Sequence, residues 1–184
     1  MRIHGLLPVR LAAMCLVAAA AMHVRAAVIH VSPYGAHIQP FSTWSTAATS
    51  VPAAVALARQ GDEVLVSNGY YTLESTVLVT NAIFLHSIAG RDDTVLDGDF
   101  SRRCIRLAAP GAVVEGFTLW LGYVEGTWPA GAGGAALVEA GTLRSCSVTD
   151  SDARFGGGVA CVAGMVTNCI IEGNAAEVEG GGVY

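Results

Sequence analysis

A repeat in the second half of the chain limits the fold more than any other sequence feature. When residues 133–149 are moved by 23 positions onto residues 156–172, five of the 17 aligned residues are identical. The identities are two leading glycines, Ala140-Gly141 and Cys146, which falls on Cys169. A weaker earlier copy covers residues 111–116, with Gly116 at the cysteine position, and the next glycine run begins at Gly180. A period of this length is typical of an array of stacked, equivalent units.

The segments between the glycines predict short strands. Runs rich in β-branched residues, bounded by Gly, Asn, Asp and Pro, lie at 63–66, 76–79, 82–85, 94–96, 104–107 and 113–119. Two or three such strands per 23 residues, with no helix between them, fit a parallel β-helix whose coils stack at about 4.8 Å. Leucine-rich repeats require regularly spaced leucines, and propeller blades are longer. We therefore predict an all-β solenoid, with its coils in residues 62–184.

A different pattern precedes these coils, in residues 27–61. A short strand at 27–31 and a loop rich in Pro and hydroxyl residues lead to a predicted helix at 51–59. Ser50 is suited to the N-cap, Pro52 to the first turn, and Gly61 to the end of the helix. This segment is predicted to form an N-terminal cap with a short capping helix.

Residues 1–26 resemble a secretory signal peptide. Arg2 and Arg10 precede an apolar run at 11–21, and small residues around Ala26 suit cleavage. The run is too short to span a bilayer, so no membrane span is predicted. A lipid anchor at Cys15 is the disfavoured alternative, because Met14 suits a lipobox poorly. We expect a secreted, periplasmic or outer-surface protein.

The charge of the chain restricts its partners. The formal net charge is −5, and removal of Arg2, Arg10 and Arg25 with the signal peptide leaves 7 arginines against 15 acidic residues, a charge of −8. No basic cluster is larger than Arg102-Arg103, so nucleic-acid binding is not expected. A polyanionic ligand would need a local arginine cluster or a bound cation.

Residues 164–176 followed by 180–184 resemble coils of the secreted right-handed β-helix proteins of the pectin-lyase-like superfamily. They are also similar to repeats of polymorphic outer-membrane proteins and autotransporter passengers, which pair Phe-x-x-Asn with Gly-Gly-Ala-Ile. Ile171-x-x-Asn174 and residues 181–184 approximate these elements, whereas the preceding coil has Ser151 where asparagine is expected. Residues 61–71 also resemble the first coil of that superfamily. The resemblance implies a right-handed parallel β-helix, and this fold hosts lyases, hydrolases, esterases and adhesins.

An insertion at residues 122–134 interrupts the repeat and lengthens the spacing from Gly111 to Gly141 to 30 residues. Solenoids place binding loops at such corners. Its aromatic residues Tyr123 and Trp128 are the predicted ligand contacts, because aromatic rings can stack on sugar rings. The alternative is that the loop packs its own aromatics onto the outside of the coil.

Acidic residues gather at Asp92-Asp93, at Asp97-Gly98-Asp99 and at Asp150-x-Asp152. A lyase of the resembled superfamily would use carboxylates to bind calcium, with an arginine or lysine as base. All three spots coincide with turn signals, so we expect these aspartates to bond their own backbone. Arg106, Arg144 and Arg154 are expected to form salt bridges with them. Asn174 is expected to satisfy turn amides. No metal site or other cofactor is predicted, and His30, His37 and His86 share no spacing that suggests a triad.

The exported chain would keep Cys104, Cys146, Cys161 and Cys169. The 23-residue period stacks Cys146 on Cys169, so a disulfide is one alternative in an oxidising compartment. We favour a ladder of buried thiols. No cysteine spacing suggests zinc.

These observations predict an exported β-helix module with a binding or structural role, with polysaccharide as the candidate partner. The alternative is a polysaccharide lyase or glycoside hydrolase. Carboxylates and arginine clustered on one sheet face would favour the enzyme, and smooth Ser/Thr/Asn ladders would favour the module. A passenger of an autotransporter would need a translocation domain beyond these residues. We expect the solenoid to continue past Tyr184, because no terminal cap follows the last glycine run.

Overall fold

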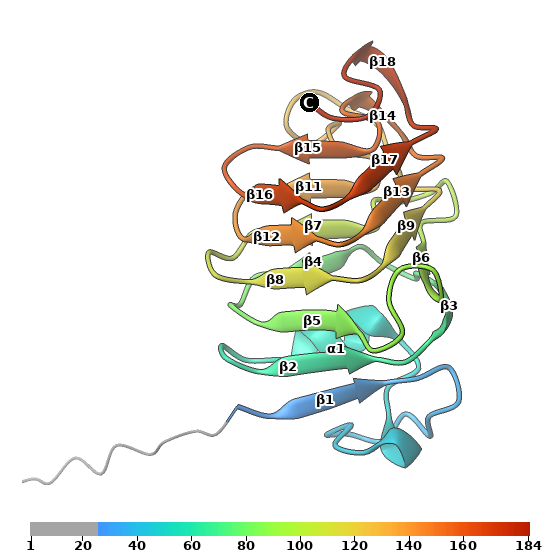
Figure 1. Cartoon of the computed structure of the whole chain (residues 1–184), viewed down its shortest axis with the longest axis vertical. Helices are drawn as coiled ribbons and strands as arrows, with labels where there is room; N and C mark the ends of the chain where they lie inside the picture. Colours follow the sequence, from blue (N-terminus) through green and yellow to red (C-terminus); the bar gives the residue numbers. More distant parts are fainter. Residues whose placement is uncertain (1–25) are drawn as a thin grey trace, which may run out of the picture.

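The computed structural model describes residues 26–184, which form a parallel β-solenoid (Figure 1). Four sheets run along it. The first has the order β1 (Val28–Val31), β2 (Glu63–Val66), β5 (Phe84–Ser87), β8 (Val113–Glu115), β12 (Thr142–Arg144), β16 (Met165–Thr167). The second contains β3 (Gly69–Thr72), β6 (Thr94–Asp97), β9 (Thr118–Trp120), β13 (Ser147–Thr149) and β17 (Ile170–Glu172).

The third sheet contains β4 (Val77–Val79), β7 (Ile105–Leu107), β11 (Ala136–Val138) and β15 (Val159–Cys161). The fourth is shorter, with β10 (Tyr123–Val124), β14 (Asp152–Phe155) and β18 (Ala175–Glu179). Every strand pair is parallel, and each coil passes through the first, second and third sheets in turn. The predicted all-β solenoid class is therefore confirmed.

Ladders of apolar side chains fill the interior. In the first sheet Val64, Leu85, Val114 and Leu143 are paired in register and fully buried. Similar ladders pass through the second and third sheets, where Leu96, Leu119 and Val148 stack in one and Ile105, Ala136 and Val159 in the other. Neighbouring coils thus cover each other's apolar surface, which explains why a chain with only 14% charged residues can bury so much of it.

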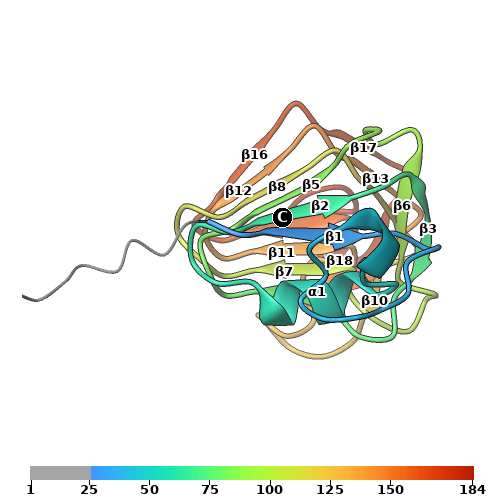
Figure 2. The ribbon, with the colours of Figure 1, turned by 90° about the horizontal axis from the view of Figure 1, so that it is seen from below.

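The N-terminal cap contains β1, a 3₁₀ turn η1 (Trp44–Thr46) and the helix α1 (Val51–Leu57). The helix packs against β1, β2 and β4, and Figure 2 shows it beside the third sheet. Ser50 caps it as expected, with its hydroxyl accepting from the Ala53 amide at 3.1 Å. The predicted end at residue 59 is wrong by two residues. The Arg59 amide instead donates to the buried carboxylate of Asp62 at 2.8 Å, which draws the chain out of the helix.

The predicted register of the last coils is confirmed. Strands β11, β12 and β13 pair with β15, β16 and β17 at a shift of 23 residues. The repeated glycines lie where coils approach closely: a Cβ at Gly134 would lie 2.4 Å from the Asp152 oxygen, and one at Gly157 only 1.6 Å from the Ala175 oxygen. A register irregularity between Ala153 and Phe155 accounts for the 24-residue step that follows.

The alignment of the weaker copy was wrong by one residue. The pairing of β8 with β12 and of β9 with β13 corresponds to a shift of 29, so Phe117 rather than Gly116 stands at the cysteine position. Phe117 is fully buried there. Gly116 instead has a φ of +78° and separates β8 from β9, which the sequence suggested to be one run. A second shift of 29, between β5 and β8, reveals another insertion at residues 88–93.

The predicted signal peptide at residues 1–26 lies, apart from its last residue, outside the described part of the chain and stays a prediction. None of the helices in residues 26–184 is long and apolar enough to cross a membrane.

Candidate functional site

The insertion at 122–134 leaves the second sheet through β10 and returns to the third sheet at β11. Arg103 of the preceding coil anchors its returning end. The guanidinium donates to the carbonyl oxygens of Ala130, Ala132 and Gly133 at 2.8, 2.7 and 2.9 Å. Burial lowers the pKa of Arg103 to about 10, so it stays charged at neutral pH. The sequence marked this residue only as part of a short basic pair, and its anchoring role was missed.

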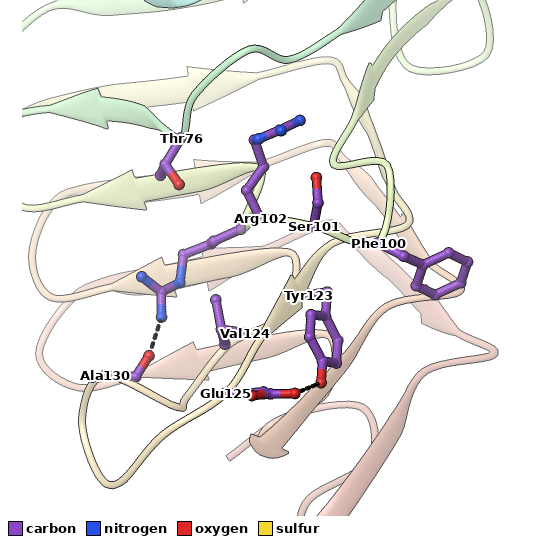
Figure 3. A pocket seen from close by; sticks show the side chains of 9 residues that line it. Thr76, Phe100, Ser101, Arg102, Tyr123, Val124, Glu125 and Ala130 are labelled. Carbon is purple, nitrogen blue, oxygen red and sulfur yellow. Dashed lines mark hydrogen bonds between the residues drawn. The ribbon is translucent and has the colours of Figure 1, made fainter.

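Two grooves flank β10. The first, the Arg102 groove, has a volume of about 510 Å³ and is lined by residues from three coils, among them Thr76, Ser101, Arg102, Tyr123 and Glu125. Figure 3 shows Tyr123 joined to Glu125, with Ser101 and Arg102 on the neighbouring loop. The Arg102 guanidinium donates to the backbone oxygen of Leu73, and this hydrogen bond holds the Arg102 side chain against the preceding coil. The lining of this open groove thus combines a guanidinium, a carboxylate and hydroxyl groups, with Arg102 pointing away from the Tyr123–Glu125 pair (Figure 3).

The second, the Asp152 groove, has a volume of about 290 Å³ on the fourth sheet and shares Tyr123, Val124 and Glu125 with the first. The other side of this groove is lined by Asp152, Arg154 and Glu177. Asp152 is the register partner of Tyr123. The hydrogen bond to Glu125, followed by burial and the nearby carboxylates, raises the pKa of Tyr123 to about 12. The phenol therefore stays protonated throughout the physiological range.

The structure does not bring the two predicted contact residues into one groove. Trp128 packs edge-on against Phe155 at 6.1 Å between ring centroids and lies 5.1 Å from Tyr184. It lines neither groove beside β10, although 45% of its surface is exposed. This packing corresponds to the alternative that we considered for the loop. Tyr123, in contrast, lines both grooves, and the role of the two residues as ligand contacts stays a prediction.

A polar ladder that the sequence did not reveal crosses the first sheet. His86, Glu115 and Arg144 are register partners on consecutive coils, spaced 29 residues apart. Glu63 contacts the His86 ring nitrogen at 2.7 Å, and Arg144 donates to Glu115 at 2.8 Å. These three residues align only when neighbouring coils are offset by 29 residues. The repeated residues of the sequence suggested offsets of 23 and 30 residues, so they could not reveal the ladder.

A third groove, the His86 groove, of about 600 Å³ lies beside this ladder. His86, Glu115, Arg91 and Asn168 are among the residues that line it. Arg91 comes from the insertion at 88–93 and donates to the oxygens of Asn168 at 3.2 Å and Cys146 at 3.4 Å. The ring of Phe84 stacks on that of His86 with centroids 4.1 Å apart. This is the mixed cluster of carboxylates and arginine that we expected of an enzyme.

Of the aspartates at turn signals, Asp97 bonds the backbone of its own turn as expected, whereas the Asp150 carboxylate accepts from the Trp120 indole at 3.1 Å. Asp97 is buried, accepts from the Asp99 amide at 2.8 Å and receives the Tyr70 hydroxyl. That hydrogen bond, after burial, helps to raise the Tyr70 pKa. Asp99 and Asp150 adopt positive φ angles of 53° and 52°.

Within residues 26–184 no group of three or more His, Cys, Asp or Glu side chains converges as metal ligation requires.

The expected ion pairs form with other partners than predicted. Arg106 makes a two-point contact with Glu139 at 2.8 and 3.0 Å, and Arg144 pairs with Glu115. Arg154 lies over the Phe155 ring at 5.7 Å. Glutamates on paired strands replace the turn aspartates as partners, because strand register places them beside the arginines.

Asn174 has the predicted turn role. Its side-chain oxygen accepts from the Ser151 amide at 3.0 Å, and its amide group donates to the oxygens of Val148 and Glu172, both at 2.9 Å. Ser151 does the same one coil earlier, accepting from the Gly122 amide at 3.0 Å. Serine in place of asparagine at position 151 therefore still provides a hydrogen-bond acceptor for the backbone of this turn.

All four cysteines of the described residues are free thiols in the structure. Cys104 and Cys146 are buried, while Cys161 and Cys169 are partly exposed. Burial raises the pKa of Cys104 to about 12. Cys146 and Cys169 thus stack as free thiols, but only Cys146 is buried as the favoured ladder required, and Cys104 lies apart on the corner before β7.

Comparison of the chain with models of protein families, with curated proteins and with solved structures finds no match. The solenoid itself is established by strand pairing alone.

Proposed function

We propose that the protein is an exported β-helix module, similar to the pectin-lyase-like superfamily, that binds a polysaccharide in the grooves beside β10. The observation that carries this proposal is that Tyr123, Glu125 and Arg102 line one open groove beside the insertion. Carboxylates accept hydrogen bonds from sugar hydroxyls, guanidinium groups donate them, and an aromatic ring offers a face to the apolar side of a sugar. Export is proposed from the signal-peptide pattern of residues 1–26, which supports a location in the periplasm, at the outer surface or in the medium.

Charge selects the class of polysaccharide. Residues 27–184 contain 7 arginines and 15 acidic residues, and the Asp152 groove adds Glu125, Asp152 and Glu177 to the surface next to Tyr123. An acidic polymer would be repelled by this field, whereas a neutral one is not. The proposed ligand is therefore a neutral polysaccharide.

Calorimetric titration with neutral oligosaccharides, compared with pectate and alginate fragments, tests the proposal. We expect saturable binding of at least one neutral glycan, and Tyr123→Ala to weaken it about ten-fold, which corresponds to about 1.4 kcal/mol. Tyr34→Ala is the matched control, because Tyr34 is 94% exposed in the N-terminal cap. Equal affinities of wild type and Tyr123→Ala would refute the site.

A second candidate function, cleavage of a polysaccharide, is favoured by one observation, the Glu63–His86–Glu115–Arg144 ladder beside the His86 groove. Paired acidic groups on one face are what general acid and base catalysis at a glycosidic bond requires. Reducing ends and unsaturated products would be assayed after incubation with a polymer panel. Turnover that Glu115→Gln abolishes and Glu139→Gln preserves would establish an enzyme. No turnover by wild type would leave the binding module.

A further inference from the structure

Cys146 and Cys169 occupy the same corner of consecutive coils, between the first and second sheets. The strands on both sides of each cysteine are paired at a shift of 23, Arg144 with Thr167 and Ser147 with Ile170. The Ile170 amide donates to the Cys146 oxygen at 2.9 Å. Parallel neighbours lie about 4.8 Å apart, and disulfides join residues whose Cα atoms are about 4.4–6.8 Å apart. The backbone therefore already meets the main geometric requirement for a disulfide.

The side chains face the same way. Cys146 is fully buried in the core, and Cys169 is partly exposed but packs against the same core. Each thiol donates to a backbone oxygen two residues earlier in the chain, Cys146 to Arg144 and Cys169 to Thr167, both at 3.3 Å. The two sulfur atoms therefore lie at equivalent places of stacked coils.

The surroundings give the two sulfurs different roles. The neighbouring Cys146 thiol, helped by backbone donors and the Arg91 guanidinium, lowers the pKa of the Cys169 thiol against the opposing effect of burial. The neighbouring Cys169 thiol and burial raise the pKa of Cys146. A thiolate is the nucleophile in disulfide exchange. The partly exposed Cys169 is thus suited to attack an external disulfide, and Cys146 to complete the exchange.

We propose that Cys146 and Cys169 form a redox-active pair that closes into an inter-coil disulfide when it meets a small-molecule disulfide such as oxidised glutathione. The Cys169 thiolate attacks one sulfur of the oxidant, forming a mixed disulfide and releasing one thiolate. The Cys146 thiol then loses its proton to solvent and attacks the Cys169 sulfur, which expels the second thiol. The two protein thiols are oxidised together, and one oxidant disulfide is reduced to two thiols.

The test exposes the reduced full chain to buffers of oxidised and reduced glutathione, with acid quenching and peptide mapping by mass spectrometry. We expect wild type to yield a peptide linked through Cys146 and Cys169. Cys146→Ala should stop at a glutathione adduct on Cys169, because the resolving thiol is gone. Cys169→Ala should give no adduct on the buried Cys146. Cys104→Ala is the control and should behave as wild type.

Two results would overturn the proposal. One is a wild-type protein that keeps both thiols in buffers that oxidise a simple dithiol. The other is a link through Cys104 or Cys161, since the register partner of Cys161 is Val138 rather than a cysteine. Mapping of the wild-type protein decides between these outcomes even if the alanine variants fold poorly, and circular dichroism reports whether they do.

Discussion

The role of a residue in this solenoid depends on what lies one coil above and below it. Ser151 and Asn174 have different side chains, yet each satisfies backbone groups at the same corner of its coil. Phe117 and Cys146 also share one position and are both fully buried there. The shape and polarity of the position are therefore preserved by stacking, while the residue type changes from coil to coil.

Asn174→Ala tests the corner ladder. The substitution removes two donors and one acceptor and leaves the amide of Ser151, a 1%-exposed residue, without its partner. We expect the free energy of unfolding to fall by about 1–3 kcal/mol, because an unsatisfied buried group costs about that much. Urea denaturation followed by circular dichroism measures the change. Asn68→Ala, at an exposed position, should change it by about 0.5 kcal/mol or less. Similar values for both variants would contradict the ladder.

Tyr123 provides a pH test of the site. Its pKa is raised to about 12, mainly by its hydrogen bond to Glu125, so the phenol should keep its proton at pH values where an ordinary tyrosine is ionised. Glu125→Gln removes the charge and should return the pKa towards 10, the usual value. Tyrosine-labelled NMR across pH 9–13 resolves Tyr123 from the exposed Tyr34. An unchanged Tyr123 titration in Glu125→Gln would show that the contact does not form.

At the scale of elements, the insertion between β10 and β11 is a surface loop fixed by a buried cation of another coil. Arg103 bonds three of its carbonyl oxygens, and Gly131 lies so close to Gly126 that a Cβ would meet the Gly126 oxygen at 2.2 Å. The loop is therefore a rigid side of the grooves beside β10. Arg103 helps to fix the shape of these grooves, while its guanidinium points into the loop.

Arg103→Ala should release the loop. Three carbonyl oxygens lose their donor, so we expect a loss of about 1–3 kcal/mol in unfolding free energy and faster protease cleavage within residues 122–134. Limited proteolysis with mass spectrometry locates the cut, and thermal unfolding reports the stability. Arg154→Ala, whose guanidinium contacts only the Phe155 ring face in the described structure, is the control. Equal cleavage in both variants would exclude Arg103 as the anchor.

The sequence predicted the strands and the stacking of the last coils because glycines and cysteines recur there at a constant shift. It failed where insertions changed that shift. The loop at 88–93 carried no repeated residue, so Arg91 and the His86–Glu115–Arg144 ladder were missed. Tyr123 was identified from its aromatic ring, but its separation from Trp128 depends on packing against Phe155, which no local pattern encodes.

At the scale of the whole molecule, the solenoid presents different chemistry on different sides. The first sheet carries the charged ladder, and the grooves lie beside β10 of the short fourth sheet. Figure 2 shows β8 of the first sheet and β10 on different sides of the solenoid. The interior is a set of apolar ladders between the two faces. The proposed binding function and the alternative catalytic one thus concern separate surfaces, and a single ligand titration can tell them apart.

The most direct test of this account is a titration of the isotope-labelled chain with neutral oligosaccharides, followed by backbone amide NMR. Binding beside β10 predicts shifts at Arg102, Tyr123, Glu125 and Asp152, with the amides of His86 and Glu115 unmoved. Shifts confined to His86, Glu115 and Arg91, or no shift with any neutral glycan of the panel, would contradict the proposed site.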